Sequence, residues 1–111
     1  LETSKKNLHL LDPCTYLEFL SLQMHADLVI TDSGGIQEET TYLGVPCLTV
    51  RPNTERPVTI TIGTNRLVKS TRQALVDAVY VRLAEGRVTR SVPPLWDGHT
   101  AERIVRVFKE A

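Results

Sequence analysis

Cysteine, aromatic residues and net charge are all scarce in this sequence, and each shortage excludes a class of protein. Of the 111 residues only Cys14 and Cys47 are cysteines, too few for the disulfide framework of a small secreted domain. We expect two reduced thiols in a cytoplasmic protein, with a single disulfide as the alternative. No apolar run is long enough to span a membrane, and no signal peptide is visible, so we expect no membrane association.

The charge balance argues against a nucleic-acid partner. Thirteen basic and thirteen acidic side chains give a formal net charge of zero. A neutral chain has no overall attraction to phosphate backbones or anionic lipids, although backbone amides could still build a local anion site. The histidines (His9, His25 and His99) do not have metal-ligand spacing with each other or with the cysteines, so we expect no metal and no cofactor.

Short apolar runs alternate with helical patterns along the chain. We expect strands at 7–11, 27–31, 45–50 and 66–69. We expect helices at 12–25, at 36–43, briefly after Pro57, at 71–85 and at 100–109. The segment 58–62 also has strand propensity, which is the alternative to the short helix. The last helix carries an apolar stripe made of Ala101, Ile104, Val105 and Phe108.

Capping residues support these boundaries. Asp12 with Pro13 favours a helix start, and Thr71 caps a later helix. Gly44 and Gly86 follow helices as stop signals. Strands that alternate with helices at this spacing predict βαβ units. The fold class is therefore α/β, a single Rossmann-like domain over 1–111 with a parallel sheet and helices on both faces.

The tetrapeptide 32–35 (DSGG) is the first candidate site, because it joins a strand to a helix. Ligands bind at the carboxyl ends of strands in such sheets. Gly34 and Gly35 would let a ligand approach the backbone, the helix amides would attract phosphate, and Ser33 would add a hydroxyl donor. The alternative is that a tight turn needs small residues for steric reasons alone.

Four further side chains have two interpretations each. Glu38 and Glu39, one turn into the same helix, either complement the helix dipole or accept hydrogen bonds from ribose hydroxyls. Arg56 follows the next strand and either binds phosphate or forms a surface pair with Glu55. Phe19 either packs in the core or offers a ring on which a base stacks.

Taken together, these segments resemble a known family. Residues 27–39 (DLVITDSGGIQEE) look like the signature of the non-hydrolysing UDP-N-acetylglucosamine 2-epimerases. Residues 43–46 (LGVP), the loop 51–57 (RPNTERP) and residues 63–68 (GTNRLV) resemble the segments that follow it in that family. The resemblance runs from about Leu8 to Val68 and continues loosely to the final helix.

The resemblance implies a fold and a set of roles. The family has the glycosyltransferase-B architecture of two facing Rossmann-like halves, and this chain would be the second, C-terminal half. Ser33, Gly34 and Gly35 would hold the UDP diphosphate. Arg56 would contact phosphate and Phe19 would flank the uracil. Glu39 would bind the ribose hydroxyls, with Glu38 the less favoured candidate.

The family interconverts UDP-N-acetylglucosamine and UDP-N-acetylmannosamine by eliminating UDP and adding it back. The partners implied are a UDP-sugar substrate, an N-terminal half of the same enzyme and a second subunit in a homodimer. No residue here matches the acid–base groups, so we expect no catalytic residue in this chain and no activity from it alone. The first residue, Leu1, suggests that the chain was cut from a longer one.

The sequence departs from the common pattern at 40–42 (TTY), Val58 and Lys69, which affects details such as domain closure. Three other functions stay open from the sequence. They are a hydrolysing epimerase that releases free N-acetylmannosamine, one half of a glycosyltransferase that transfers sugar to an acceptor, and a non-catalytic nucleotide-binding module. Product assays would separate the first two, and UDP calorimetry would test the third.

Overall fold

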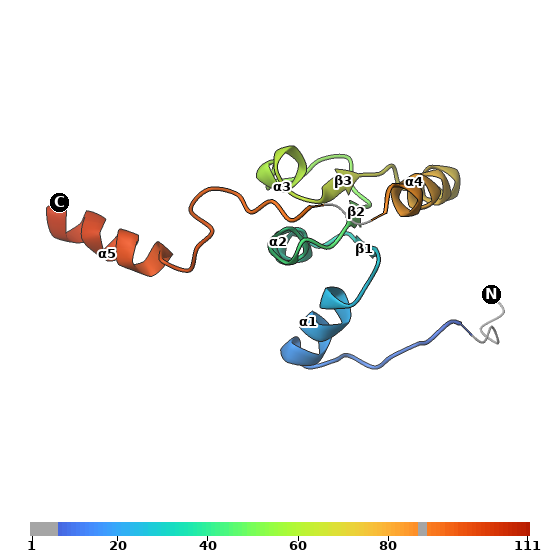
Figure 1. Ribbon diagram of the computed structural model, residues 1–111, viewed down its shortest axis with the longest axis horizontal. Helices are drawn as coiled ribbons and strands as arrows, with labels where there is room; N and C mark the ends of the chain where they lie inside the picture. Colours follow the sequence, from blue (N-terminus) through green and yellow to red (C-terminus); the bar gives the residue numbers. More distant parts are fainter. Residues whose placement is uncertain (1–6, 87–88) are drawn as a thin grey trace.

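The computed structural model describes residues 7–86 and 89–111 and places a small parallel sheet at the centre (Figure 1). Its strands lie in the order β1 (Val29–Thr31), β2 (Cys47–Thr49) and β3 (Asn65–Leu67). Both neighbouring pairs are parallel, with Cys47 opposite Val29 on one side and opposite Asn65 on the other. The predicted α/β architecture is confirmed. Each strand is shorter than predicted: β1 keeps the end of the predicted 27–31, β2 keeps the middle of 45–50, and β3 begins one residue before the predicted 66–69.

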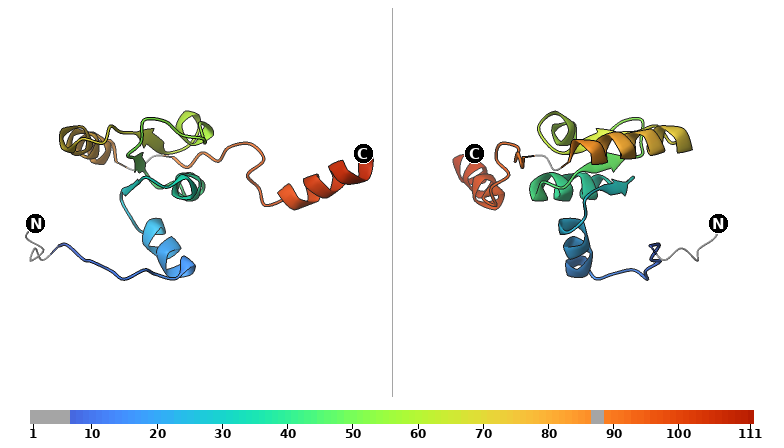
Figure 2. Two further views of the ribbon diagram at one scale, coloured as in Figure 1. Left: turned by 180° about the vertical axis from the view of Figure 1, so that it is seen from behind. Right: turned by 45° about the vertical axis from the view of Figure 1, so that its right-hand side comes forward.

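Helices cover both faces of this sheet, as the alternating pattern predicts. The helices are α1 (Tyr16–Met24), α2 (Gly34–Leu43), α3 (Val58–Thr61), α4 (Arg72–Glu85) and α5 (Thr100–Glu110). Figures 1 and 2 show α2 and α3 on one face and α4 on the other. Helix α1 packs against α2 rather than on the strands. After the connection at 92–98, α5 lies away from the sheet.

Several local signals predicted the boundaries correctly. Gly44 ends α2 in the left-handed conformation, with a φ of 76°. The hydroxyl of Thr71 accepts a hydrogen bond from the Ala74 amide (3.2 Å) at the start of α4. Gly86 ends that helix. The helix after Pro57 is confirmed as α3, so the strand alternative at 58–62 was wrong.

The N-terminal prediction was wrong in two respects. Residues 7–11 do not form a strand, because they pair with no neighbouring strand in the part of the chain that the structure describes. Helix α1 begins at Tyr16, and Asp12 does not cap it. Thr15 caps it instead, since its hydroxyl accepts from the Glu18 amide (3.3 Å) while its own amide donates to the Glu18 carboxylate (3.0 Å).

The interior is apolar around β2 and polar between β3, α2 and α3. Cys47 and Leu48 are fully buried and are flanked by the buried residues Val45 and Val68. Buried polar side chains gather between β2, β3, α2 and α3, on the side of β2 that also carries the Cys47 thiol: Gln37, Thr40, Thr41, Thr49, Thr59 and Asn65. The predicted stripe of α5 is not buried, since α5 lies apart. Ile104 is 51% exposed and Phe108 is 77% exposed.

Three further expectations concern the cysteines, a membrane span and a metal site. Cys14 and Cys47 are both free thiols, so the disulfide alternative is wrong. No helix among residues 7–86 and 89–111 has the length and apolarity needed to cross a bilayer. In the same residues, no cluster of histidine, cysteine and carboxylate side chains could hold a metal ion. Leu1 lies outside the described residues.

Candidate functional site

The 32–35 turn lies at the carboxyl end of β1 and opens α2. The backbone amide of Ser33 donates to the Thr31 hydroxyl (3.0 Å), which fixes the turn. Ser33 is the N-cap of α2, but its hydroxyl makes no capping hydrogen bond. The first amides of a helix have no intrahelical partner. The start of α2 therefore offers unpaired amides beside an uncommitted hydroxyl, at the positive end of the helix dipole.

The two glycines of the turn differ in their surroundings. A Cβ built on Gly35 would meet no atom within 4 Å, so this side of the turn is open. A Cβ on Gly34 would lie 2.9 Å from Cζ of Arg56. The guanidinium of Arg56 therefore lies directly over the first turn of α2, and only glycine at position 34 leaves room for it. The sequence predicted both residues at the carboxyl ends of successive strands, and the structure brings them together.

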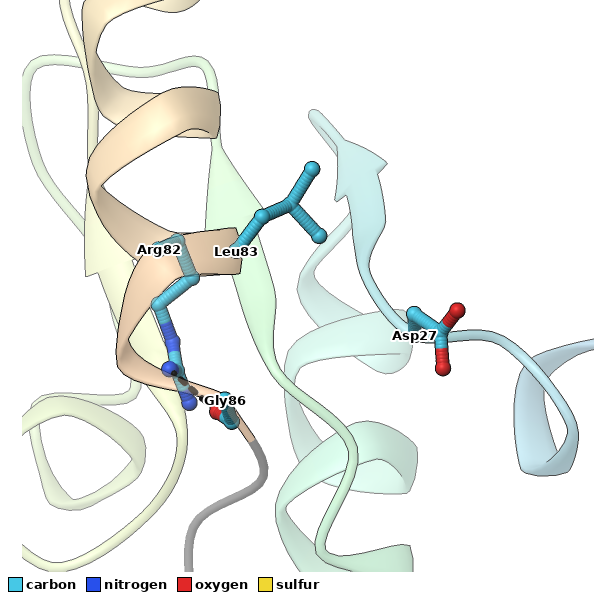
Figure 3. Close-up of a pocket in the computed structure, with 4 residues that line it drawn as sticks. All are labelled: Asp27, Arg82, Leu83 and Gly86. Atoms are coloured by element: carbon cyan, nitrogen blue, oxygen red, sulfur yellow. Dashed lines mark hydrogen bonds between the residues drawn. The ribbon is translucent and has the colours of Figure 1, made fainter.

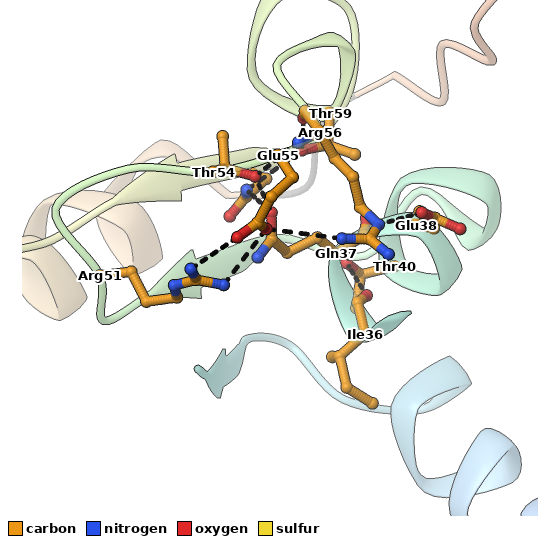
Figure 4. Close-up of polar contacts among 10 residues, drawn as sticks. Ile36, Gln37, Glu38, Thr40, Arg51, Thr54, Glu55, Arg56 and Thr59 are labelled. Atoms are coloured by element: carbon orange, nitrogen blue, oxygen red, sulfur yellow. Dashed lines mark hydrogen bonds and ion pairs between the residues drawn. The ribbon is translucent and has the colours of Figure 1, made fainter. Parts of the chain in front are cut away.

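Arg56 is paired with carboxylates in this position (Figure 4). Its Nε donates to Oε1 of Glu38, and its Nη1 lies 3.6 Å from Oε2 of Glu55. Glu55 in turn forms two hydrogen bonds with Arg51, at 2.8 and 3.3 Å, and these lower the pKa of its carboxyl. Arg56 is about one third exposed. Ion pairs this exposed contribute only about 0–1 kcal/mol, so an anion could replace Glu38 at little cost.

A buried amide fixes the loop that carries Arg56. Oε1 of Gln37 accepts from the Thr54 hydroxyl (2.6 Å) and from Nδ2 of Asn65 (3.1 Å). The Thr54 hydroxyl accepts from the backbone amide of Arg56 (3.0 Å). Gln37 thus connects α2, the 51–57 loop and β3. These bonds hold the loop against the start of α2 (Figure 4).

Asn65 extends this network to β2 and α3. The hydroxyl of Thr49 donates to Oδ1 of Asn65 (2.5 Å), and Nδ2 of Asn65 also donates to the Thr59 hydroxyl (3.1 Å). Thr59 in turn donates to the backbone carbonyl of Arg56 (2.7 Å). Sequence reasoning missed Gln37 and Asn65. The available signal was that each is a polar residue at a buried position, Gln37 on α2 and Asn65 on β3.

Glu39 lies on a different side of α2 from the loop. Its Oε2 accepts a hydrogen bond from Nε2 of Gln23 on α1 (2.7 Å). Glu39 also lines a cavity of about 250 Å³ together with Glu38, Tyr42 and Trp96. Phe19, on α1, is 43% exposed, so the core-packing interpretation of this ring was wrong.

A second cavity lies at the opposite edge of the sheet, where β1 begins and α4 ends (Figure 3). It has a volume of about 200 Å³ and is lined by Asp27, Arg82, Leu83 and Gly86. Arg82 is 2% exposed and donates to the carbonyl of Gly86 (3.1 Å). Burial, followed by repulsion from Arg66, lowers the pKa of Arg82. This cavity is separate from the 32–35 turn.

A glycine turn between a parallel strand and a helix, at the carboxyl edge of the sheet, identifies the chain as a Rossmann-like α/β domain. The sequence comparison is more specific. Residues 1–109 match the sequence profile of UDP-N-acetylglucosamine 2-epimerase, and the chain belongs to that family.

Individual relatives agree with this assignment. The chain is 45% identical over 105 residues to UDP-N-acetylglucosamine 2-epimerase of Methanocaldococcus jannaschii, covering 95% of the chain and 28% of that protein. It is 44% identical over 108 residues to the Escherichia coli K12 enzyme, covering 94% of the chain and 29% of the enzyme. The chain therefore spans less than a third of these relatives.

Solved structures show the same partial match. The Methanocaldococcus jannaschii enzyme in complex with UDP-GlcNAc and UDP superimposes with a TM-score of 0.81 at 43% identity, over 98% of this chain and 30% of that one. MnaA of S. aureus in a co-structure with UDP gives a TM-score of 0.83 at 30% identity, over 96% and 30%. The fold of the chain is therefore that of part of these two proteins.

Proposed function

We propose that this chain is the C-terminal, nucleotide-sugar-binding half of a UDP-N-acetylglucosamine 2-epimerase. The observation that carries the proposal is the close approach of the Arg56 guanidinium to Gly34. It puts a cation beside the unpaired amides of α2 and the free hydroxyl of Ser33. Amides, hydroxyl and guanidinium are the donors that a diphosphate needs.

The remaining parts of a UDP molecule would contact α1 and α2. Glu39 lies five residues after Gly34, which is about 7.5 Å along a helix. Its carboxylate would accept hydrogen bonds from the ribose hydroxyls, and the half-exposed ring of Phe19 would flank the uracil. Structures of relatives contain UDP or UDP-GlcNAc, which supports a ligand of this class.

In the reaction, this half would hold the leaving group. The whole protein would interconvert UDP-N-acetylglucosamine and UDP-N-acetylmannosamine by eliminating UDP and adding it back. Negative charge that develops on the diphosphate would be stabilised by the α2 amides and Arg56. The acid–base groups would come from an N-terminal half of the enzyme, and two copies would form a homodimer. The isolated chain 1–111 would then bind UDP without converting the sugar.

Calorimetry of chain 1–111 with UDP tests the binding site. Ser33→Trp would fill the turn, and Arg56→Ala would remove a charged hydrogen-bond donor, so each should lower UDP affinity at least about tenfold. Arg66→Ala is the matched control, because Arg66 pairs with Glu85 away from the turn. If both site variants bind UDP like the parent chain, the site assignment is wrong.

A product assay tests the reaction. Chain 1–111 and the full-length protein are each incubated with UDP-N-acetylglucosamine. Formation of UDP-N-acetylmannosamine by the full-length protein only is the expected result. Conversion by chain 1–111 alone would contradict the proposal that the acid–base groups lie in the N-terminal half. Release of free N-acetylmannosamine would identify a hydrolysing enzyme.

A further inference from the structure

A partly buried hydrogen bond joins two helices and involves Glu39, the carboxylate that would bind the ribose in the proposed function. Nε2 of Gln23 on α1 donates to Oε2 of Glu39 on α2 (2.7 Å). Gln23 is 3% exposed, whereas Glu39 is only partly buried. The amide thus contacts the carboxylate from inside the protein. On its accessible side, Glu39 lines the cavity shared with Tyr42 and Trp96.

Gln23 is an unfavourable residue for a position that serves packing alone. Its Oε1 is buried and has no hydrogen-bond partner among the described residues. A buried polar atom without a partner destabilises a protein, so leucine or methionine would fill this space with less penalty. Among the described residues, the one hydrogen bond that the Gln23 side chain makes goes to Glu39. The polar group is therefore explained by what it does to that carboxylate.

The position of Gln23 on α1 links it to a second proposed ligand contact. Phe19 and Gln23 are four residues apart, so they lie on the same face of the helix. The hydrogen bond from Gln23 to Glu39 therefore also fixes the position of the Phe19 ring relative to Glu39. One contact then orients the two groups that would hold the nucleoside, one through its ribose and one through its base.

We propose that Gln23 is a positioning residue, which holds the Glu39 carboxylate in the orientation that accepts the ribose hydroxyls of a uridine nucleotide. This inference rests on the proposed function. It adds that one carboxylate oxygen is occupied by the protein, so that the other faces the ligand. Discrimination between ribose and deoxyribose would then depend on a residue that never touches the ligand.

The test measures affinity for UDP and for 2′-deoxy-UDP by calorimetry on chain 1–111. The parent chain should prefer UDP by roughly tenfold, since a hydrogen bond to a charged group is lost with the 2′-hydroxyl. Gln23→Leu should reduce this preference to near unity and leave the thermal midpoint close to that of the parent. Gln73→Leu is the matched control, because Gln73 also donates to a carboxylate, Asp77, but on the exposed side of α4.

A second variant separates the carboxylate from structural support. In Glu39→Gln, Nε2 of Gln23 can still donate to the amide oxygen at position 39, so the fold should be about as stable as the parent. The carboxylate is then no longer at position 39, so the preference for UDP should still be lost. If Gln23→Leu does not fold, Gln23→Asn removes the same hydrogen bond with a shorter amide.

Each outcome bears on one of the two claims. If Gln23→Leu loses stability but keeps the preference for UDP, the contact is structural and the inference is wrong. If the parent chain binds UDP and its deoxy analogue equally, Glu39 does not bind ribose; the inference then fails while the phosphate site stands. If the parent does not bind UDP at all, the proposed function fails, and the inference fails with it.

Discussion

The guanidinium of Arg56 lies against the backbone of Gly34, so that any side chain at position 34 would collide with it. This contact joins the 51–57 loop to the first turn of α2. Arg56 also pairs with Glu38 one turn further along the helix. The position of the Arg56 guanidinium thus depends on two residues of α2. Gly34 leaves room for it, and the carboxylate of Glu38 pairs with it.

Gly34→Ala should displace Arg56 without unfolding α2. The new methyl group would lie 2.9 Å from Cζ of the guanidinium, which is a flexible side-chain end and can move away. We expect UDP affinity to fall about tenfold, as for the loss of one charged hydrogen bond. In an Arg56→Ala background the same substitution should have little further effect. Additive losses in calorimetry would show that the two residues act independently.

Asn65→Ala should loosen the loop from inside. The substitution removes three hydrogen bonds, to Gln37, Thr49 and Thr59, and leaves buried polar atoms unpaired. We expect the free energy of unfolding in urea to fall by about 2–3 kcal/mol. UDP affinity should also fall, although Asn65 is not a proposed ligand. Asn53→Ala, at an exposed position of the same loop, is the control and should change neither quantity.

Much of this architecture was predictable, because its signals are local. A cap, a glycine stop or an alternating pattern acts within a few residues, which is why α2, α3 and α4 were predicted well. The strand at 7–11 was wrong because a strand needs a neighbour, which sequence alone does not supply. The start of α1 was wrong because Asp12 with Pro13 competed with the better capping pair, Thr15 and Glu18.

The site was predictable in part. Ser33, Gly34 and Arg56 stand beside recognisable strand ends, so their convergence follows from the rule for parallel sheets. Gln23, Gln37 and Asn65 were missed. Their partners lie 16 to 28 residues away in sequence for the contacts Gln23–Glu39, Thr54–Gln37 and Asn65–Gln37. No local pattern identifies which buried amide meets which distant acceptor.

The two cysteines should differ in reactivity. Cys47 is fully buried on β2, and burial raises the pKa of its thiol, partly offset by hydrogen bonds from Thr40 and Thr49. A higher pKa leaves less thiolate near neutral pH. At pH 7.5, roughly one unit below the usual thiol pKa, iodoacetamide should modify the partly exposed Cys14 first. Mass spectrometry of the intact chain should show one adduct, and a second only after urea is added. Equal modification of both thiols would contradict the fold around β2.

The start of α5 should depend on pH through Asp97. Arg103 forms hydrogen bonds with the Asp97 carboxylate, and together with the His99 amide it holds the pKa of that group well below its usual range. A depressed pKa means that the contribution to stability is present above the ordinary value of about 4 and is lost only as the pH falls through the lower, folded value.

Trp96 reports on this turn directly, because it is the one tryptophan of the sequence and precedes Asp97. Its fluorescence should stay constant from pH 7 down to about 4 and change only in stronger acid. Asp97→Asn should shift the emission already at pH 7. An unchanged spectrum in this variant would mean that the ion pair does not shape the turn.

The polar packing between α2, α3 and β3 also has a thermodynamic consequence. Unfolding this region would expose amides and hydroxyls in addition to hydrocarbon, and hydration of polar surface lowers the heat capacity change that hydrocarbon raises. The heat capacity of unfolding should therefore fall below the common value of about 12–15 cal/mol/K per residue. The stability of this chain would then vary less with temperature than that of a domain with a wholly hydrocarbon core.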